Sequence, residues 1–102
     1  MLTFLKKLFG GNPVNYKELI SNGAIIADVR SASEYNEGHI PGSKNLPLDS
    51  IRKKVAELKK RNKPVITVCR SGARSGMAKN ILKSAGIEVY NGGPWTSLKT
   101  KL

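Results

Sequence analysis

The chain has 102 residues, of which 39% are hydrophobic and 25% are charged. This length favours a single domain, and the composition is too apolar for an intrinsically disordered chain. One cysteine excludes an internal disulfide and a cysteine-rich zinc site, and the sequence has no apolar run of the roughly 20 residues that span a bilayer.

The net charge of +11 comes entirely from the second half of the chain. Residues 1–51 hold five basic and five acidic groups, whereas residues 52–102 hold thirteen basic and two acidic groups. A basic surface attracts anions of every size, from small oxyanions to nucleic acid or acidic proteins. Charge alone therefore does not select a partner.

Residues 1–12 form a predicted N-terminal extension, which precedes a single domain over residues 13–102. Apolar residues recur at helical spacing in this extension, but Lys6 and Lys7 interrupt the apolar stretch that a signal peptide needs. We interpret the extension as a short amphipathic helix that packs on the domain or frays, with a membrane-surface anchor as the alternative. Without an export signal, the lone thiol predicts a cytoplasmic location.

The first half of the predicted domain contains two helical segments and two strands. Asn15 caps a short helix, and the continuous apolar run at 24–29 is typical of a strand that is covered on both faces. Ser33 caps one helical turn, which Gly38 ends. A turn at 40–43 and a short strand at 45–46 follow.

The second half begins with a helix capped by Asp49 or Ser50. Ile51, Val55 and Leu58 recur at i, i+4 and i+7, with basic residues on the other face. The remaining elements are a strand at 65–68, a helix with apolar positions from Met77 to Ala85, a strand at 87–90, a turn at 91–93, and a last helix that begins at Pro94 and is lined by Trp95, Leu98 and Leu102. Alternating strands and helices predict an α/β fold with a small central parallel sheet and helices on both faces.

Cys69 directly follows the predicted strand at 65–68, and a helix begins close behind it. In open α/β sheets this edge, at the carboxyl ends of the strands, is where ligands bind. Small residues let the loop curl tightly, so that its amides and the helix N-terminus form an anion-binding cradle. Two arginines add positive charge, and a guanidinium can hold an oxyanion through two hydrogen bonds. The predicted anion-binding residues are Arg70, Ser71, Gly72, Ala73 and Arg74.

Such surroundings lower the pKa of a cysteine thiol from its usual value of about 8.5. We therefore predict that Cys69 is a thiolate at neutral pH and acts as the catalytic nucleophile. A buried apolar role would explain the cysteine alone. It would not explain two arginines and several small residues placed around one strand-to-helix turn.

Three motifs in order along the chain resemble those of the rhodaneses, also called thiosulfate sulfurtransferases. The segment CRSGARS at 69–75 is similar to the active-site loop of that family. DVR at 28–30, followed by EY at 34–35 and GHIPGSKN at 38–45, is similar to its upstream signature. NGG at 91–93 with Trp95 resembles its C-terminal one. The resemblance covers about residues 13–102, and the domain is identified on these motifs as rhodanese-like.

The resemblance implies a sulfurtransferase that needs no cofactor or metal. Cys69 would take a sulfane sulfur from a small anionic donor such as thiosulfate and hold it as a persulfide, with the loop amides around that sulfur. With no second cysteine, the acceptor would be an external thiol or a sulfur-carrier protein. The resemblance assigns structural support to Asp28, Arg30, Glu34 and His39.

A cysteine phosphatase or arsenate reductase is the main alternative, because such enzymes also place a cysteine and an arginine in a strand–loop–helix. Their arginine follows the cysteine after five intervening residues, whereas Arg74 follows Cys69 after four. The shorter loop suits one extra sulfur atom better than a phosphate tetrahedron. A second alternative is a non-enzymatic binding module, but such domains in this family usually lack the cysteine.

Other readings find less support in the sequence. His39 is the only histidine and so the only partner for a Cys–His dyad, but it lies in a glycine-flanked turn that favours a structural role. The basic run at 52–63 has no interleaved aromatic residue, which argues against nucleic-acid binding by stacking. It is typical of a solvated helix face, or of a face that docks an acidic acceptor protein or the RNA of a thiolation system. Nothing else in the sequence indicates a membrane partner.

Overall fold

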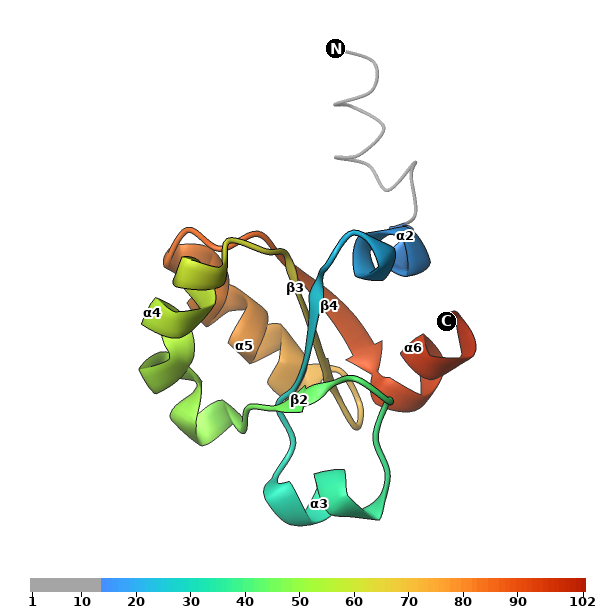
Figure 1. Ribbon diagram of the computed structural model, residues 1–102. Helices are drawn as coiled ribbons and strands as arrows, with labels where there is room; N and C mark the ends of the chain where they lie inside the picture. Colours follow the sequence, from blue (N-terminus) through green and yellow to red (C-terminus); the bar gives the residue numbers. More distant parts are fainter. Residues whose placement is uncertain (1–13) are drawn as a thin grey trace.

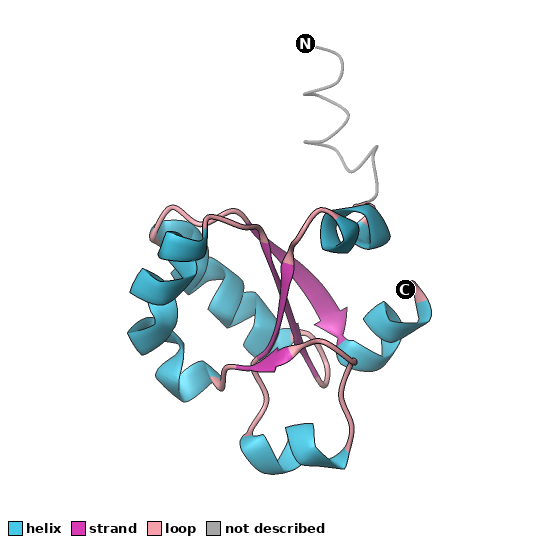
Figure 2. Ribbon diagram, viewed as in Figure 1, coloured by secondary structure: helices cyan, strands magenta, loops and turns pink. Residues whose placement is uncertain are grey.

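The computed structural model describes residues 14–102 (Figure 1 and Figure 2), so the extension predicted for residues 1–12 lies outside the described residues. In this described part, none of the helices is both long and apolar enough to cross a membrane. Helices and strands alternate along it. Their bounds are α2 Tyr16–Ser21, β1 Ile25–Asp28, α3 Ala32–Glu37, β2 Lys44–Asn45, the 3-10 helix η1 Leu48–Ser50, α4 Ile51–Arg61, β3 Val65–Cys69, α5 Ala73–Ser84, β4 Val89–Pro94 and α6 Trp95–Thr100.

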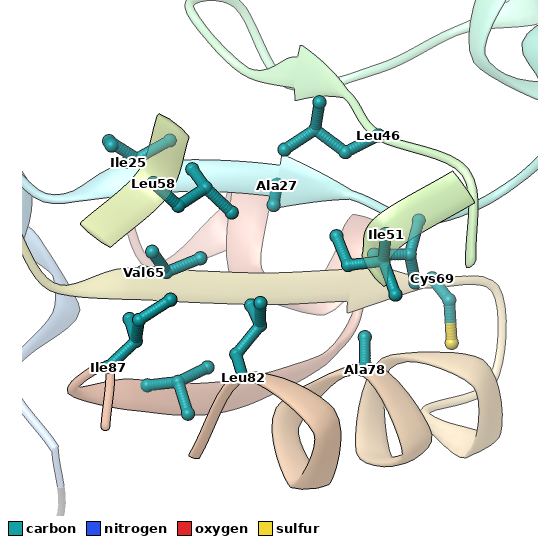
Figure 3. Close-up of a cluster of buried hydrophobic side chains, with 12 residues drawn as sticks. Ile25, Ala27, Leu46, Ile51, Leu58, Val65, Cys69, Ala78, Leu82 and Ile87 are labelled. Carbon is teal, nitrogen blue, oxygen red and sulfur yellow. The ribbon is translucent and has the colours of Figure 1, made fainter. Parts of the chain in front are cut away.

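The four strands run parallel in the order β2-β1-β3-β4, which confirms the predicted α/β fold with a central parallel sheet. Successive side chains of β1 point to opposite faces. Ile25 and Ala27 pack in a cluster with residues of α4 and α5 (Figure 3), whereas Ile26 packs in a second cluster with residues of α2 and α6. Helices therefore cover both faces, and every position of β1 is buried.

The central strand β3 lies between β1 and β4 and is buried along its whole length. Its alternate residues Val65 and Cys69 belong to the cluster that α4 and α5 cover. Ile66 and Val68 belong to the cluster on the opposite face. The Cys69 thiol therefore lies on the α5 side of the sheet, at its carboxyl edge.

Two helix starts differ from the predicted caps. Ser31, and not Ser33, caps α3, because its hydroxyl accepts from the Glu34 amide while the Glu34 carboxylate accepts from the Ser31 amide at 3.1 Å. Ser50 occupies the N-cap of α4, but its hydroxyl donates to the Pro47 carbonyl at 3.2 Å and caps nothing. The preceding 3-10 turn, η1, leads the chain into α4 instead.

The turn predicted at 91–93 is wrong, because these residues continue β4. The pairing of β4 with β3 shifts between Thr67 and Val68, so that Gly92 is an extra residue in a β-bulge. A Cβ atom at Gly92 would lie 2.9 Å from Ile66 Cγ2 and 3.0 Å from Val68 Cγ1, so only glycine fits there without a shift. Pro94 ends this strand and is the N-cap of α6, not its first residue.

Two apolar residues that were predicted to line helices are exposed. Met77 is 52% exposed, because α5 turns Ser75, Ala78 and Leu82 toward the sheet instead. Leu102 is 41% exposed, because α6 ends at Thr100 and only Leu98 of that helix is buried.

Candidate active site

Cys69 is the last residue of β3, and its sulfur lies beside the loop that opens α5 (Figure 3). The Cys69 Sγ accepts hydrogen bonds from the amides of Gly72 at 2.9 Å and Ser75 at 3.4 Å. The Ser75 Oγ lies 3.3 Å from the same sulfur. Three polar groups, one from the loop and two from the first turn of α5, therefore converge on the thiol.

This environment favours the thiolate. Burial by itself raises the pKa of Cys69, but the hydrogen bonds from the Ser75 hydroxyl and amide and from the amides of Gly72 and Ser71 outweigh it. The pKa of the Cys69 thiol is therefore lower than its ordinary value. A thiolate is the form of cysteine that attacks sulfur.

The loop curls tightly over the sulfur, as its small residues predict. Cys69 is 0% exposed. Gly72 has a φ of 103°, in the left-handed region that glycine adopts most readily, and its amide turns inward to the sulfur. Cys69 therefore lies beneath the loop backbone and not on an open surface.

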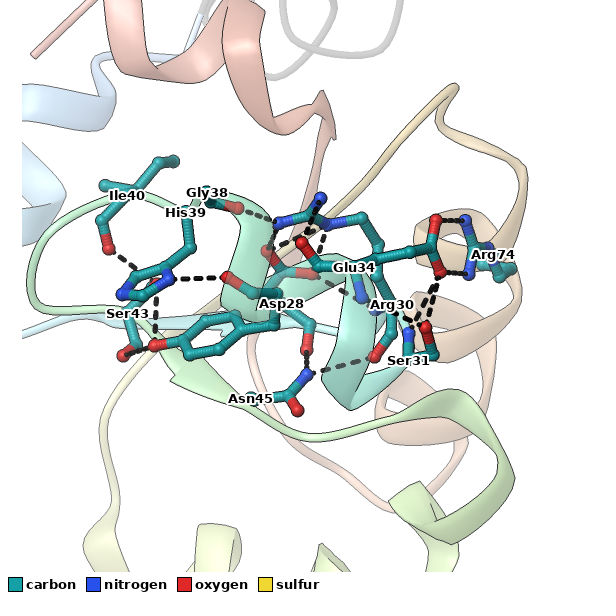
Figure 4. Close-up of polar contacts among 11 residues, drawn as sticks. Asp28, Arg30, Ser31, Glu34, Gly38, His39, Ile40, Ser43, Asn45 and Arg74 are labelled. Carbon is teal, nitrogen blue, oxygen red and sulfur yellow. Dashed lines mark hydrogen bonds and ion pairs between the residues drawn. The ribbon is translucent and has the colours of Figure 1, made fainter.

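The two predicted anion-binding arginines have different surroundings. Arg74 is held by Glu34, whose two carboxylate oxygens accept from its Nη1 and Nη2 at 2.7 and 2.9 Å (Figure 4). The Arg74 hydrogen bonds, together with the Ser31 amide, hold the pKa of Glu34 well below its usual range. The hydrogen bond to the Glu34 carboxylate in turn raises the pKa of Arg74. Arg70 is exposed and forms no ion pair within residues 14–102. Of the two arginines, Arg70 is therefore the one whose positive charge is not paired with a carboxylate of the described chain.

A buried ion pair positions Glu34. The Arg30 Nη2 lies 2.7 Å from the Asp28 Oδ2, and the two side chains are 6% and 0% exposed. Arg30 also donates to the carbonyls of Gly38 at 2.7 Å and Glu34 at 3.3 Å, while its guanidinium lies 4.8 Å from the centre of the Trp95 ring. This pair therefore ties α3 to the end of β1, and α3 carries the carboxylate that binds Arg74 (Figure 4).

His39 lies in the turn that follows α3 and contacts Tyr35 of that helix. Its Nδ1 lies 2.7 Å from the Tyr35 carbonyl oxygen, and its ring stacks on the Tyr35 ring with 3.7 Å between centroids. No hydrogen bond joins His39 to Cys69 in the described chain. The geometry gives no support to a Cys–His dyad.

Sequence reasoning did not assign a role in the site to Ser75 or Asn91. Ser75 is fully buried beside the thiol, and its Oγ lies 2.7 Å from the Asn91 Oδ1. The small polar residue six positions after Cys69 was a signal for Ser75. Asn91 reaches the loop from the neighbouring strand, across the sheet, and no local pattern indicates that contact.

The structure places a thiol between the central parallel strand and the helix that follows it, where backbone amides hold it. This arrangement is that of an α/β domain with a cysteine at the carboxyl edge of its sheet. The sequence profile of the Rhodanese-like domain matches residues 12–94. The chain belongs to the rhodanese-like domain family.

Individual proteins and structures agree with this assignment. YqhL of Bacillus subtilis is 38% identical over 69 residues, which cover 67% of this chain and 54% of YqhL. Thiosulfate sulfurtransferase PspE of Escherichia coli is 35% identical over 68 residues, or 65% of each protein. A structure titled rhodanese with anions from E. coli matches with a TM-score of 0.68 and 31% identity, over 74% of this chain and 91% of that chain. The chain thus spans about half of YqhL and about two thirds of PspE.

Proposed function

We propose that this protein is a sulfurtransferase of the thiosulfate:cyanide class, which carries a sulfane sulfur on Cys69 as a persulfide. The observation that carries the proposal is the position of the Cys69 sulfur, which accepts hydrogen bonds from the Gly72 and Ser75 amides at the carboxyl end of β3. The relationship to a protein named thiosulfate sulfurtransferase supports the same chemistry.

The proposed reaction has two displacements at sulfur. In the first, the Cys69 thiolate attacks the sulfane sulfur of thiosulfate. A bond from Sγ to that sulfur forms, the bond to the sulfonate sulfur breaks, and sulfite leaves with the electron pair. In the second, a nucleophilic acceptor attacks the outer sulfur of the persulfide, and the Sγ leaves as a thiolate.

The loop supplies electrostatic stabilisation to both steps. Its inward amides hold negative charge that lies first on Cys69 and then on the outer sulfur. The exposed guanidinium of Arg70 attracts the anionic donor to the mouth of the loop, since the charge of Arg74 is already compensated by Glu34. The donor enters when the segment from Arg70 to Gly72 moves away from the sulfur.

The acceptor must come from outside the chain, because Cys69 is the only cysteine. We propose an external thiol or a sulfur-carrier protein as the acceptor, in a reducing cytoplasm that keeps the thiol free. The exposed basic side chains of α4 and of the segment after it form no ion pair within residues 14–102 and suit an acidic acceptor. They are Arg52, Lys53, Lys59, Lys60, Arg61 and Lys63.

Intact-mass measurement after incubation with thiosulfate tests the proposal. The native protein should gain one sulfur atom, and cyanide should remove it as thiocyanate. Cys69→Ser is the matched control, because it keeps the size of the side chain and removes the nucleophile. Failure of the native protein to gain sulfur, or an equal gain by Cys69→Ser, would contradict the proposal. Hydrolysis of an aryl phosphate that depends on Cys69 would favour the phosphatase alternative instead.

A further inference from the structure

The Asn91 side chain reaches the cysteine loop from β4. Asn91 is the register partner of Thr67, which lies two residues before Cys69 on the same face of the sheet. Its Oδ1 accepts from the Gly93 amide at 2.9 Å, and its Nδ2 donates to the Gly72 carbonyl at 3.3 Å. Because an amide N–H only donates and a carbonyl only accepts, these two partners determine which way the Asn91 side chain faces.

Ser75 lies between Asn91 and the thiol. Its Oγ has three neighbours within hydrogen-bond distance, which are the Asn91 Oδ1 at 2.7 Å, the Gly72 carbonyl oxygen at 3.1 Å and the Cys69 Sγ at 3.3 Å. The Ser75 hydroxyl has one hydrogen, so it donates to one of these groups at a time. The two oxygens only accept, whereas the sulfur donates as a thiol and accepts as a thiolate.

The charge of Cys69 therefore decides where the hydroxyl hydrogen goes. A neutral thiol donates its own hydrogen to Ser75, and the hydroxyl then donates to the nearest oxygen, the Asn91 Oδ1. A thiolate is the strongest acceptor of the three, because hydrogen bonds to a charged group are about twice as strong as neutral ones. When the hydroxyl turns to the thiolate, the Asn91 Oδ1 keeps its bond from the Gly93 amide and is not left unpaired.

We propose that the Ser75 hydroxyl switches its hydrogen bond between Asn91 and Cys69 as the sulfur gains and loses charge, and that Asn91 is the positioning residue for this switch. The proposal rests on the proposed sulfur transfer and deepens it. During discharge, the acceptor breaks the persulfide bond and the electron pair goes to the Sγ. The hydroxyl of Ser75 then turns from Asn91 to the sulfur and stabilises the leaving thiolate.

The charged groups around the cysteine loop take no part in this switch. Arg70 is exposed on the loop, Arg74 of α5 is paired with Glu34 of α3, and Asp28 is paired with Arg30 at the end of β1. In residues 14–102, no charged side chain forms a hydrogen bond with Ser75 or Asn91. Titration of Cys69 is thus coupled to Asn91 through a neutral hydroxyl.

A double-mutant cycle on the alkylation rate of Cys69 tests the coupling, with Ser75→Ala, Asn91→Asp and the double variant. A carboxylate at position 91 competes more strongly for the Ser75 hydrogen, so Asn91→Asp should raise the midpoint pH by about one unit. Ser75→Ala should raise the midpoint pH by a similar amount. Ser75→Thr keeps a hydroxyl at this position and should therefore keep the native midpoint. The double variant should shift by less than the sum of the two single shifts, because the part of the Asn91→Asp shift that acts through the Ser75 hydroxyl is then gone and only direct repulsion by the carboxylate remains.

Asn80→Asp is the matched control, since it adds the same charge at an exposed position of α5. It should leave the midpoint unchanged. Additive shifts in the double variant, or a native midpoint in Asn91→Asp, would overturn the proposal. Alkylation involves no sulfur donor, so these results stand even if the native protein fails to take up sulfur from thiosulfate.

A second measurement uses variants that retain Asn91. The Gly93 amide bonds to the Asn91 Oδ1, so its NMR shift should titrate with the same midpoint as Cys69 when the hydroxyl turns away. In Ser75→Ala this Gly93 titration should disappear, while the Gly72 amide, which bonds to the sulfur directly, should still titrate. A Gly93 titration that persists in Ser75→Ala would refute the switch.

Discussion

Glu34 on α3 and Arg74 on α5 are joined by two hydrogen bonds of 2.7 and 2.9 Å between carboxylate and guanidinium. The contact links the helix after β1 to the helix that follows the cysteine loop. Each side chain is about one third exposed, at 30% for Glu34 and 34% for Arg74, so solvent screens the pair in part.

The stabilisation by this ion pair should depend on pH. The pKa of Glu34 is lower in the folded protein than its ordinary value of about 4.3, so the pair stabilises the fold above that pH. The contribution decreases as the pH falls below it, because the Glu34 carboxylate then binds a proton in the unfolded chain while it stays ionised in the folded protein. Urea unfolding of Glu34→Gln should show a lower free energy of unfolding than the native protein at pH 7, with a smaller difference at pH 3. An equal difference at both pH values would contradict this.

The two arginines should respond differently to substitution. Arg70→Ala should lower kcat/KM for thiosulfate by about three- to tenfold, the effect of removing one exposed charge from an anion site, and added salt should reduce the difference. Steady-state kinetics at two ionic strengths measures both. Lys83→Ala is a control that removes an equal exposed charge from the far end of α5. If both variants behave alike, Arg70 does not attract the donor.

Arg74→Ala should impair turnover more than Arg70→Ala, because it leaves the Glu34 carboxylate uncompensated near the cysteine loop. From the sequence alone, a loss of about 2 to 4 kcal/mol of transition-state stabilisation would follow from removal of an anion-hole donor. The pairing with Glu34 predicts that Glu34→Gln partly rescues Arg74→Ala. A double variant no better than Arg74→Ala would favour direct contact between Arg74 and the donor.

Cys69 should titrate below an ordinary thiol. The alkylation rate of the folded protein, followed against pH, should have a midpoint below that of the same protein unfolded in urea, where the usual value of about 8.5 applies. The loop covers the sulfur, so bulky reagents should react more slowly than small ones at every pH. A folded midpoint at or above the unfolded one would show that burial dominates over the hydrogen bonds.

Gly92→Ala should destabilise the fold by about 1 to 3 kcal/mol, as overpacking of a buried site does. The added methyl would lie within 3.1 Å of Ile66, Val68 and the Thr67 carbonyl oxygen. Gly42→Ala is the comparison, because its Cβ would meet nothing within 4 Å and only its φ of 85° opposes the change. Urea unfolding should therefore show a smaller loss for Gly42→Ala, of about 1 kcal/mol.

Local patterns predicted the elements of this fold well where one segment decides the outcome. The apolar run at 24–29 indicated a strand covered on both faces, and β1 is buried at every position. Apart from the two helix caps, the wrong assignments depend on neighbours in space. The turn expected at 91–93 is a strand because β3 pairs with it, and Met77 is exposed because the sheet lies on another side of α5.

The cysteine and its loop were evident from the sequence, because the strand end, the small residues and the arginines are contiguous. The side chains that contact this loop from other elements were not evident from the sequence. Glu34 meets Arg74 across 40 residues, and Asn91 meets Ser75 across 16, so both contacts exist only once the sheet has formed. Sequence reasoning assigned Arg74 to the substrate and did not predict that Glu34 would also bind its guanidinium.

The bulge at Gly92 also lets the backbone fold back, so that the Gly93 amide reaches the Asn91 Oδ1 two residues earlier. An extended, regular strand would hold these two groups too far apart. An engineer who grafts only the seven-residue cysteine segment onto another parallel sheet would transfer the thiol and its amides but leave out the amide side chain that faces Ser75. The transplantable unit is the loop together with its irregular neighbouring strand.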